Sequence, residues 1–135
     1  MPQIQRTSRF AGPALIVYVV AWLIGTHLPG SVIQDSFSGN DKIQHFAAYA
    51  VLSLLAFNFM SARWVGSLRC FVSLFFSLAA FAAFDELTQI LVPGRFSDWG
   101  DWLADMAGSS VSLALAACWA QYRRSRLASL QRMTG

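Results

Sequence analysis

Residues 70–92 read CFVSLFFSLAAFAAFDELTQILV, an apolar run that carries an acidic pair, Asp85 and Glu86, close to its end. The run falls within the ~17–25 residues that an α-helix needs to cross a hydrocarbon core of ~30 Å. Pro93 and Gly94 follow directly, and this pair is a strong signal for the end of a helix. The stretch therefore predicts a transmembrane helix whose last turns hold charged groups near the edge of the membrane.

The rest of the chain holds three more apolar stretches of comparable length. With 135 residues, 56% of them hydrophobic, the chain is large enough for one domain, and the connections between the stretches are too short to fold as a second one. We predict a single domain over residues 1–135, with the all-α architecture of a four-transmembrane-helix bundle. Its helices are expected at about residues 10–28, 41–62, 67–92 and 98–122.

Charged residues divide between the two ends of this predicted bundle. Bases flank the end that holds both termini, while the acids gather at the other end together with Lys42 and Arg95. By the positive-inside rule, this division places both termini in the cytoplasm and the acidic end outside. The basic group comprises Arg6, Arg9, Arg63, Arg69, Arg123, Arg124, Arg126 and Arg132, and the acidic group comprises Asp35, Asp41, Asp85, Glu86, Asp98, Asp101 and Asp105.

The net charge of +3 and the basic tail do not indicate a nucleic-acid partner. Arg123, Arg124 and Arg126 directly follow a predicted spanning helix, where such residues set orientation and contact anionic lipid. The partner expected for this tail is therefore the lipid bilayer, and no nucleic acid.

Three predicted helices carry polar side chains at matching heights near the acidic end. Asp41, His45 and Tyr49 are spaced four residues apart, so they stack on one face of their helix. The same spacing rule groups polar residues on the other two helices, and three helices thus point titratable groups at one level. The corresponding residues are Asp85, Glu86 and Gln89 on the helix at 67–92, and Asp98, Asp101 and Asp105 on the helix at 98–122.

An ionised carboxylate within the hydrocarbon layer costs at least a few kcal/mol, so these acids should face the bundle interior and find partners or hold a proton. Arg95 is the expected partner, because its guanidinium can bind a carboxylate bidentately and still reach a phosphate. Lys42 and His45 are the other donors, while His27, which has no charged neighbour in sequence, is assigned to the membrane interface. Several acids sharing few bases indicate a protonated carboxyl, a bound cation or an anionic ligand. A structural polar plug that fixes helix register is the alternative reading.

Small residues recur at every fourth position of the last predicted helix, from Ala104 to Ala120. In lipid, such a stripe lets another backbone approach closely and gain dispersion contacts. We interpret it as a packing seam inside the bundle. The alternative is a homodimer that forms through Gly108, Ser112 and Ala116.

The order of these residues resembles the VanZ-like family of small bacterial membrane proteins, named for a member associated with resistance to the glycopeptide teicoplanin. The resemblance covers roughly residues 10–121. Asp105 stands where many members carry asparagine, which adds a carboxyl to the cluster. The matching pieces are Pro29, Asp41-Lys42-x-x-His45-x-x-x-Tyr49, Asp85-Glu86-x-x-Gln89, Pro93-Gly94-Arg95, Asp101 and Gly108.

The resemblance implies a multi-pass protein of the bacterial cytoplasmic (inner) membrane. We expect an outward-facing polar pocket that recognises a cell-envelope, lipid-linked or glycopeptide-type ligand and contributes to glycopeptide resistance. No cofactor and no catalytic residue is assigned, and the candidate metal ligands are His45, Glu86, Asp101 and Asp105. The expected pocket residues are Asp41, Lys42, His45, Tyr49, Asp85, Glu86, Gln89, Arg95, Asp101 and Asp105.

Two other functions stay open. In an enzyme acting on a lipid-linked phosphate or a cell-wall precursor, Lys42 and Arg95 would hold the phosphate and His45 or Glu86 would move protons. The sequence contains no recognised hydrolase or phosphate-loop motif, so it does not decide whether the protein is an enzyme. A proton-coupled carrier would also use buried acids, but four helices without inverted repeats suit alternating access poorly.

Overall fold

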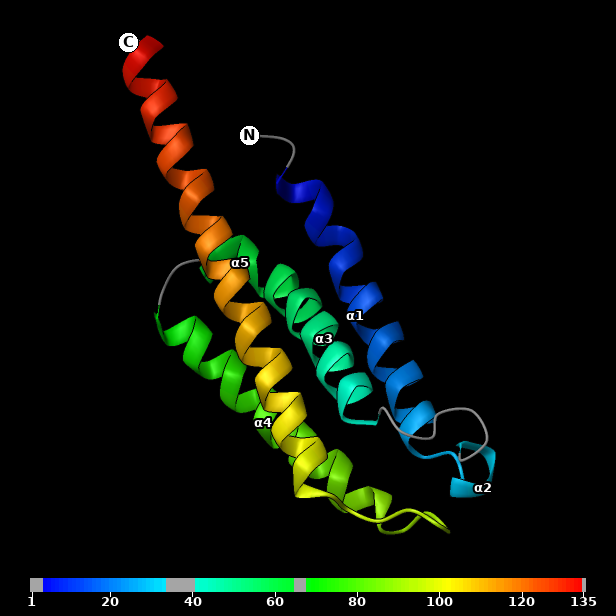
Figure 1. The fold of residues 1–135 in the computed structure, drawn as a ribbon. Coiled ribbons are helices and arrows are strands. Elements are labelled where there is room, and N and C mark those ends of the chain that lie inside the picture. The colour runs from blue at the N-terminus through cyan, green and yellow to red at the C-terminus, as the bar shows by residue number, and fades with distance from the viewer. Residues whose placement is uncertain (1–3, 34–40, 65–67, 135) are drawn as a thin grey trace.

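The structure of the protein is a computed structural model, and it describes residues 4–33, 41–64 and 68–134. The described residues form four long helices and one short one, and no strand occurs among them. Figure 1 shows α1, α3 and α5 side by side, with α4 packed obliquely against α5. In chain order the elements are α1 (Ile4–Thr26), α2 (Gly30–Ile33), α3 (Asp41–Trp64), α4 (Leu68–Gln89) and α5 (Trp99–Thr134).

The predicted all-α bundle of four long helices is confirmed. Three helices are long and apolar enough to cross a membrane, over Asp41–Met60, Leu68–Gln89 and Trp99–Met133. The apolar stretch of α1, Phe10–Thr26, is shorter, although α1 as a whole has 23 residues and rises ~34 Å. Large apolar side chains that remain exposed on the outside of the bundle are those that lipid would cover. The protein is therefore a helical protein of membrane type.

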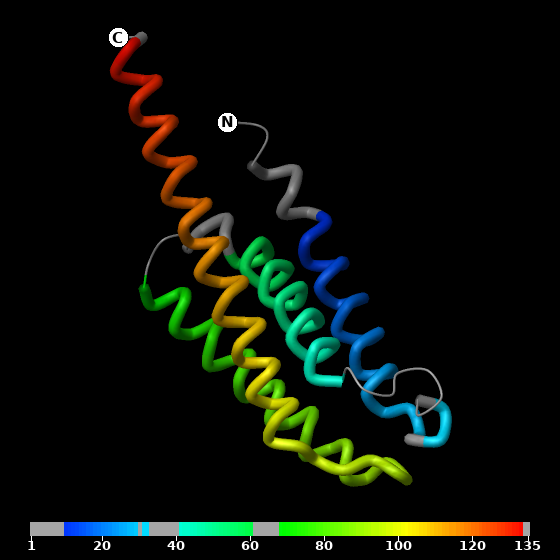
Figure 2. Tube along the Cα trace, in the orientation of Figure 1, coloured from blue at the N-terminus to red at the C-terminus, as the bar shows by residue number. Residues whose placement is uncertain are grey.

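Two helices extend further than the sequence predicts. Helix α1 begins at Ile4 instead of residue 10, and α5 continues to Thr134 instead of ending at residue 122. The hydrophobic length needed to cross a membrane gives α5 a minimum length but does not determine where it ends. Residues 123–134 include neither glycine nor proline, so they can continue the helix in water. Figure 2 shows this last part of α5 projecting beyond the other helices. Asp35, which the sequence assigns to the acidic end, lies outside the described residues.

A tight turn after α4 replaces the last helical residues that the sequence predicts, because α4 ends at Gln89 and not at residue 92. The backbone N–H of Arg95 donates to the Val92 carbonyl over 3.1 Å, and Gly94 takes a positive φ of 77°. Proline followed by glycine at the two central positions is the pattern of a type II turn. The turn fixes the position from which the Arg95 side chain extends.

The small residues of α5 form a seam with α3, which runs parallel to α5 in Figure 1. A Cβ atom at Gly108 would collide with the backbone carbonyl of Phe46, and Ser112 Oγ donates to the Ala50 carbonyl over 2.7 Å. The seam inside the bundle is therefore confirmed. Gly108, Ser112 and Ala116 are buried within the chain, and a homodimer through these residues stays a prediction.

Between the polar end and the end that holds the termini, an apolar core fills the space between α3, α4 and α5. Both termini lie at one end of the bundle, and the α4–α5 turn lies at the other (Figure 1). The polar residues discussed next therefore lie at the end opposite the termini. The buried core residues are Tyr49, Leu52, Ala56, Phe57, Leu74, Leu78, Ala82, Met106, Leu113 and Ala116.

Candidate functional site

A cluster of buried polar side chains lies where α3 and α5 begin and where α1 and α4 end. It contains His45 and Asp105, whose exposed fractions are only 2% and 1%. The structure thus brings together polar residues from three helices that the sequence placed at one level, and adds side chains from α1. The buried residues of the cluster are Thr26, His45, Tyr49, Asp85, Glu86, Gln89, Asp101, Asp105 and Ser109.

His45 of α3 faces Asp105 of α5 across the helix seam. Its Nδ1 lies 3.0 Å from Asp105 Oδ1, and its Nε2 lies 3.8 Å from Asp41 Oδ1, one turn earlier on α3. The edge of Trp22 packs against the imidazole, with ring centroids 5.2 Å apart and planes at 85°. The ring is therefore held in one orientation, with a buried acid on one nitrogen and a more exposed acid near the other.

Asp85 lies at the α1–α4 contact and is almost fully buried. It accepts hydrogen bonds from Trp22 Nε1 at 3.1 Å, Thr26 Oγ1 at 3.0 Å and Gln89 Nε2 at 3.4 Å. His27 Nδ1 is 3.8 Å from the same carboxyl, so His27, which has no charged neighbour in sequence, gains one through the fold. Sequence separations of about 60 residues hide these contacts, although the four-residue spacing of Trp22 and Thr26 already indicated a shared face on α1.

Glu86 stabilises the start of α5. Its Oε2 accepts a 2.9 Å hydrogen bond from the backbone N–H of Asp98, and its Oε1 accepts from Gln89 Nε2 at 3.4 Å. A carboxylate at this position also meets the positive end of the α5 dipole. Glu86 thus finds its partners in a helix terminus and an amide instead of the arginine that the sequence suggested.

Lys42 joins α3 to the first turn of α5. Its Nζ donates to Asp98 Oδ2 at 2.6 Å and to Asp101 Oδ1 at 3.0 Å. A side chain at Gly100 would meet this ammonium, so the glycine leaves room for it. The hydrogen bond from Lys42 and, to a smaller extent, the bond from the Gly100 N–H lower the pKa of Asp98 below its ordinary value. Asp98, which was not among the expected pocket residues, therefore stays ionised beside Lys42.

Arg95 pairs with none of Asp85, Glu86 and Asp105, the carboxylates for which the sequence suggested it. Its Nε and Nη2 donate to the Thr26 backbone carbonyl over 3.2 and 3.0 Å, and no ion pair links it to any carboxylate that the structure describes. This carbonyl belongs to the last turn of α1, where helical acceptors lack internal donors. Arg95 therefore ties the α4–α5 turn to α1, and some of its five N–H donors have no partner among the described residues.

A cavity of about 210 Å³ opens between α1 and α3 beside this cluster. Three of the expected pocket residues, Asp41, His45 and Arg95, line it together with Gln44. Lys42 and Asp101 lie instead on the α5 side, and Tyr49, Asp85, Glu86, Gln89 and Asp105 lie outside the cavity lining. The remaining lining residues are Trp22, Gly25, Thr26 and Leu28.

Two sets of side chains in the cluster could hold a metal ion. Asp41, His45 and Asp101 form the outer set, and His45, Glu86 and Asp105 form the inner set. In each set, one ligand atom per residue lies within 4.8 Å of the others. His45 belongs to both, so the two sets are alternatives for one imidazole.

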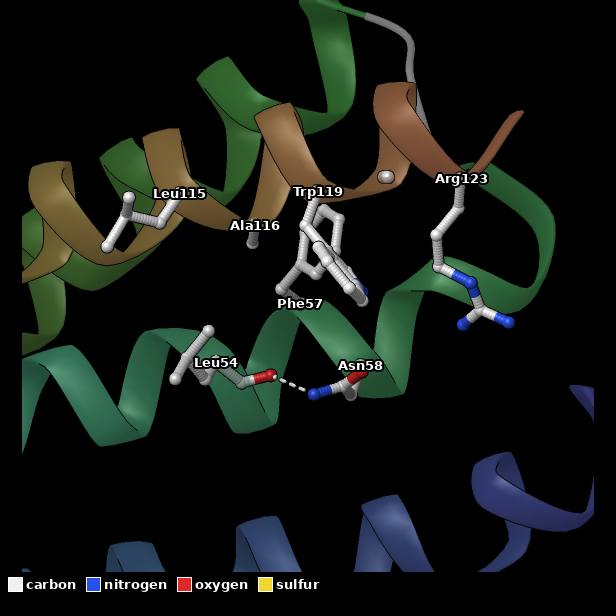
Figure 3. A pocket seen from close by; sticks show the side chains of 8 residues that line it. Leu54, Phe57, Asn58, Leu115, Ala116, Trp119 and Arg123 are labelled. Carbon is white, nitrogen blue, oxygen red and sulfur yellow. Dashed lines mark hydrogen bonds between the residues drawn. The ribbon is translucent and has the colours of Figure 1, made fainter. Parts of the chain in front are cut away.

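A larger, mostly apolar groove of about 480 Å³ lies at the opposite end of the α3–α5 seam, near the termini. Figure 3 shows Phe57 of α3 and Trp119 of α5 facing each other there, with Arg123 at the end of the row. None of the expected pocket residues lines it. The lining residues are Leu54, Phe57, Asn58, Leu115, Ala116, Trp119, Ala120 and Arg123.

The bundle and its buried polar end define a helical membrane protein with a polar cluster at one end. A comparison with protein families matches residues 28–120 to the family described as VanZ/LLP1, and the chain belongs to this family. The chain matches no curated protein and no solved structure. The matched segment begins after Thr26, so Trp22 and Thr26 of the Asp85 contact lie before it.

Proposed function

We propose that this VanZ-like membrane protein recognises a cell-envelope ligand, of lipid-linked or glycopeptide type, through the cavity between α1 and α3. The observation that carries the proposal is the lining of that cavity, where Arg95, Asp41, Gln44 and His45 meet at the polar end of the bundle. Buried or half-buried charges in a membrane protein mark ligand and ion sites by default. In the proposed role the protein binds its ligand without converting it.

The chemistry of the lining favours an anionic group that is flanked by hydrogen-bonding groups. The N–H donors of Arg95 that no described residue accepts suit a phosphate or a carboxylate, and Asp41 and Gln44 suit hydroxyl, amide or ammonium groups. Pockets that enclose a drug-sized molecule span ~300–1,000 Å³. At about 210 Å³, the cavity matches one head group or one terminal group of a larger molecule.

The proposed orientation places this cavity on the outer side of the bacterial cytoplasmic membrane. Arg123, Arg124 and Arg126 follow the apolar part of α5 at the end that holds the termini, and Arg6 and Arg9 stand at the start of α1. The positive-inside rule assigns such an end to the cytoplasm. A ligand of the cell envelope would then meet the cavity from outside. A cysteine-labelling experiment on intact cells, with single cysteines at Gln44 and Arg132 in a cysteine-free background, tests this orientation.

The binding experiment uses the full chain in lipid nanodiscs and three probes: phosphatidylglycerol, a polyprenyl phosphate and teicoplanin. We expect one of these probes to bind, and Arg95→Ala to weaken that binding by at least about tenfold. Arg123→Ala, which removes an arginine at the far end, is the matched control and should change the affinity by less than about twofold. Equal losses in both variants, or no binding of any probe, would count against the proposal. A new product in the wild-type sample would favour the enzymatic alternative.

The contribution to glycopeptide resistance has a separate test. Expression of the chain in a susceptible bacterium should raise the teicoplanin concentration that stops growth, and Arg95→Ala should abolish the increase. An unchanged inhibitory concentration, with protein present in the membrane, would limit the proposal to ligands other than glycopeptides.

A further inference from the structure

The inner part of the polar cluster contains an oxygen atom that the fold does not satisfy. Asp105 Oδ2 has no hydrogen-bond partner among the described residues, although its side chain is only 1% exposed. Tyr49 of α3 and Ser109 of α5 follow one turn deeper, and their hydroxyl oxygens likewise have no partner in the described part of the chain. Buried polar atoms without partners are rare in folded proteins and ask for an explanation such as an ion.

The atoms around Asp105 are spaced as metal ligands are. Two ligand atoms at ~2.1 Å from one cation lie ~3.0–3.5 Å apart when they subtend a right or tetrahedral angle. His45 Nδ1 and Asp105 Oδ1 are 3.0 Å apart, and a carboxylate oxygen of Glu86 completes a set within 4.8 Å. We propose that His45, Glu86 and Asp105 bind one divalent transition-metal ion.

The charges of the inner cluster favour a cation over a proton. Glu86 and Asp105 face a single imidazole, while the two basic side chains of this end are engaged elsewhere. Lys42 binds Asp98 and Asp101, and Arg95 binds a backbone carbonyl. A proton on Asp105 Oδ2 would itself need an acceptor, whereas a metal ion held by the Asp105 carboxyl group needs none and compensates both carboxylates.

The outer set, Asp41, His45 and Asp101, is the weaker candidate although its ligand atoms also lie within 4.8 Å of one another. The Asp41 side chain is 54% exposed, and Asp101 already accepts a hydrogen bond from the Lys42 ammonium at 3.0 Å. A cation there would be repelled by Lys42, and its ligands would be held by water as well as by protein. The inner three residues are all buried, with exposed fractions of 2%, 5% and 1%.

The ligand types narrow the choice of metal. Calcium and magnesium are normally held by oxygen atoms alone, whereas an imidazole with carboxylates suits zinc and manganese. We therefore assign the site to Zn²⁺ or Mn²⁺. The inference does not depend on the envelope ligand, because the cation would lie deeper than the cavity and compensate the acids there.

The experiment uses the full chain, purified without a histidine tag, stripped with a chelator and titrated with ZnCl₂ or MnCl₂ alone. Elemental analysis after dialysis should find about one metal ion per chain, and the melting temperature should rise with added metal. Asp105→Asn preserves the side-chain shape and should weaken metal binding by at least about tenfold, whereas Asp41→Asn, the matched outer variant, should change it by less than about twofold.

Glu86→Gln provides a second inner variant if Asp105→Asn fails to fold, and it keeps an oxygen for the Asp98 N–H. Absence of stoichiometric metal in the wild type, undiminished binding in the inner variants, or an equal loss in Asp41→Asn would overturn the inference. Because no organic probe is used, failure here leaves the proposed ligand recognition intact. Metal binding without any response to the organic probes would contradict the proposed ligand recognition and leave the metal site intact.

Discussion

The two ends of the α3–α5 seam use the same pair of helices in different ways. At the end where both helices begin, buried acids and a histidine form a cluster beside a cavity of about 210 Å³. At the far end, apolar and aromatic side chains line a groove of about 480 Å³, and Arg123 is the one charged residue in the part of the lining that the structure describes (Figure 3). The larger hollow is apolar and lipid can fill it, so its presence needs no functional explanation. Burying charge is costly, so the smaller, polar hollow is the better indicator of function.

The largest effect is expected at Gly108, on which the close approach of the helices at the polar end depends. Gly108→Leu would drive a side chain into the Phe46 carbonyl and should cost several kcal/mol, at or above the ~4–5 kcal/mol that only exceptional substitutions reach. Gly25→Ala is the control, since nothing lies within 4 Å of a Cβ atom there. Unfolding in mixed detergent micelles measures both. A Gly108→Leu protein as stable as the control would show that the seam is not closely packed.

The next effect concerns Asp85, which satisfies donors from two helices. Asp85→Ala leaves Trp22 Nε1 without its acceptor, which should cost ~1–3 kcal/mol, and adds the smaller loss of the Thr26 bond, whose hydroxyl keeps the Leu23 carbonyl as an acceptor at 3.3 Å. At the groove, Leu115→Ala removes a side chain that is already 66% exposed and should change the free energy of unfolding by less than ~1 kcal/mol. Equal destabilisation by the two variants would remove the energetic difference between the ends.

A smaller effect compares the two arginines. Arg95→Ala loses two hydrogen bonds to the Thr26 carbonyl and should lower stability by ~1–3 kcal/mol. Arg123→Ala should cost less than ~0.5 kcal/mol, because no hydrogen bond or ion pair joins Arg123 to any described residue. Hydrogen exchange at the last turn of α1 gives the sharper readout, since only the Arg95 variant should expose it. Unchanged exchange there would mean that Arg95 does not tie α1 to the α4–α5 turn.

The smallest effect is a pH dependence at the exposed edge of the polar end. Lys42 lowers the pKa of Asp98 in the folded protein, so the ionised carboxylate stabilises the fold above its ordinary pKa of 3.8. This contribution is lost as the pH falls below that value through the lower pKa of the folded state. Between about pH 6 and pH 3, the melting temperature of Asp98→Asn should therefore fall less than that of the wild type. Parallel curves would show that the Lys42 bond does not persist in solution.

Much of the fold could be predicted because it depends on local properties of the chain. The apolar runs predicted the four long helices, and the four-residue spacing of small residues predicted a packing seam on the last helix, which the structure places against α3 at Gly108. The same spacing placed Asp41, His45 and Tyr49 on one face, and His45 does meet Asp105. The end of α5 was missed because crossing a membrane sets a minimum length for a helix, and only a breaking residue sets its end.

The partners of the polar residues were less predictable. Arg95 binds a backbone carbonyl. Every residue has such a carbonyl, so the sequence does not show which one an arginine binds, whereas acidic side chains can be read from the sequence as candidate partners. The contacts of Trp22 and His27 with Asp85 depend on how α1 is rotated against α4, which helical periodicity alone does not determine. A pattern of spacing shows which residues share a face, but the facing helix decides what they touch.

The length of α5 has a consequence for salt dependence. Its 36 residues rise ~54 Å, whereas the hydrocarbon core is ~30 Å thick, so its final turns stand in water beyond the lipid head groups. Arg132 lies nine residues past Arg123, or ~14 Å further along the axis, which exceeds the ~8 Å over which anionic lipid attracts it at physiological ionic strength. At low ionic strength the attraction reaches further, so the final turns of α5 should lie closer to the membrane surface. At high ionic strength this attraction should be lost.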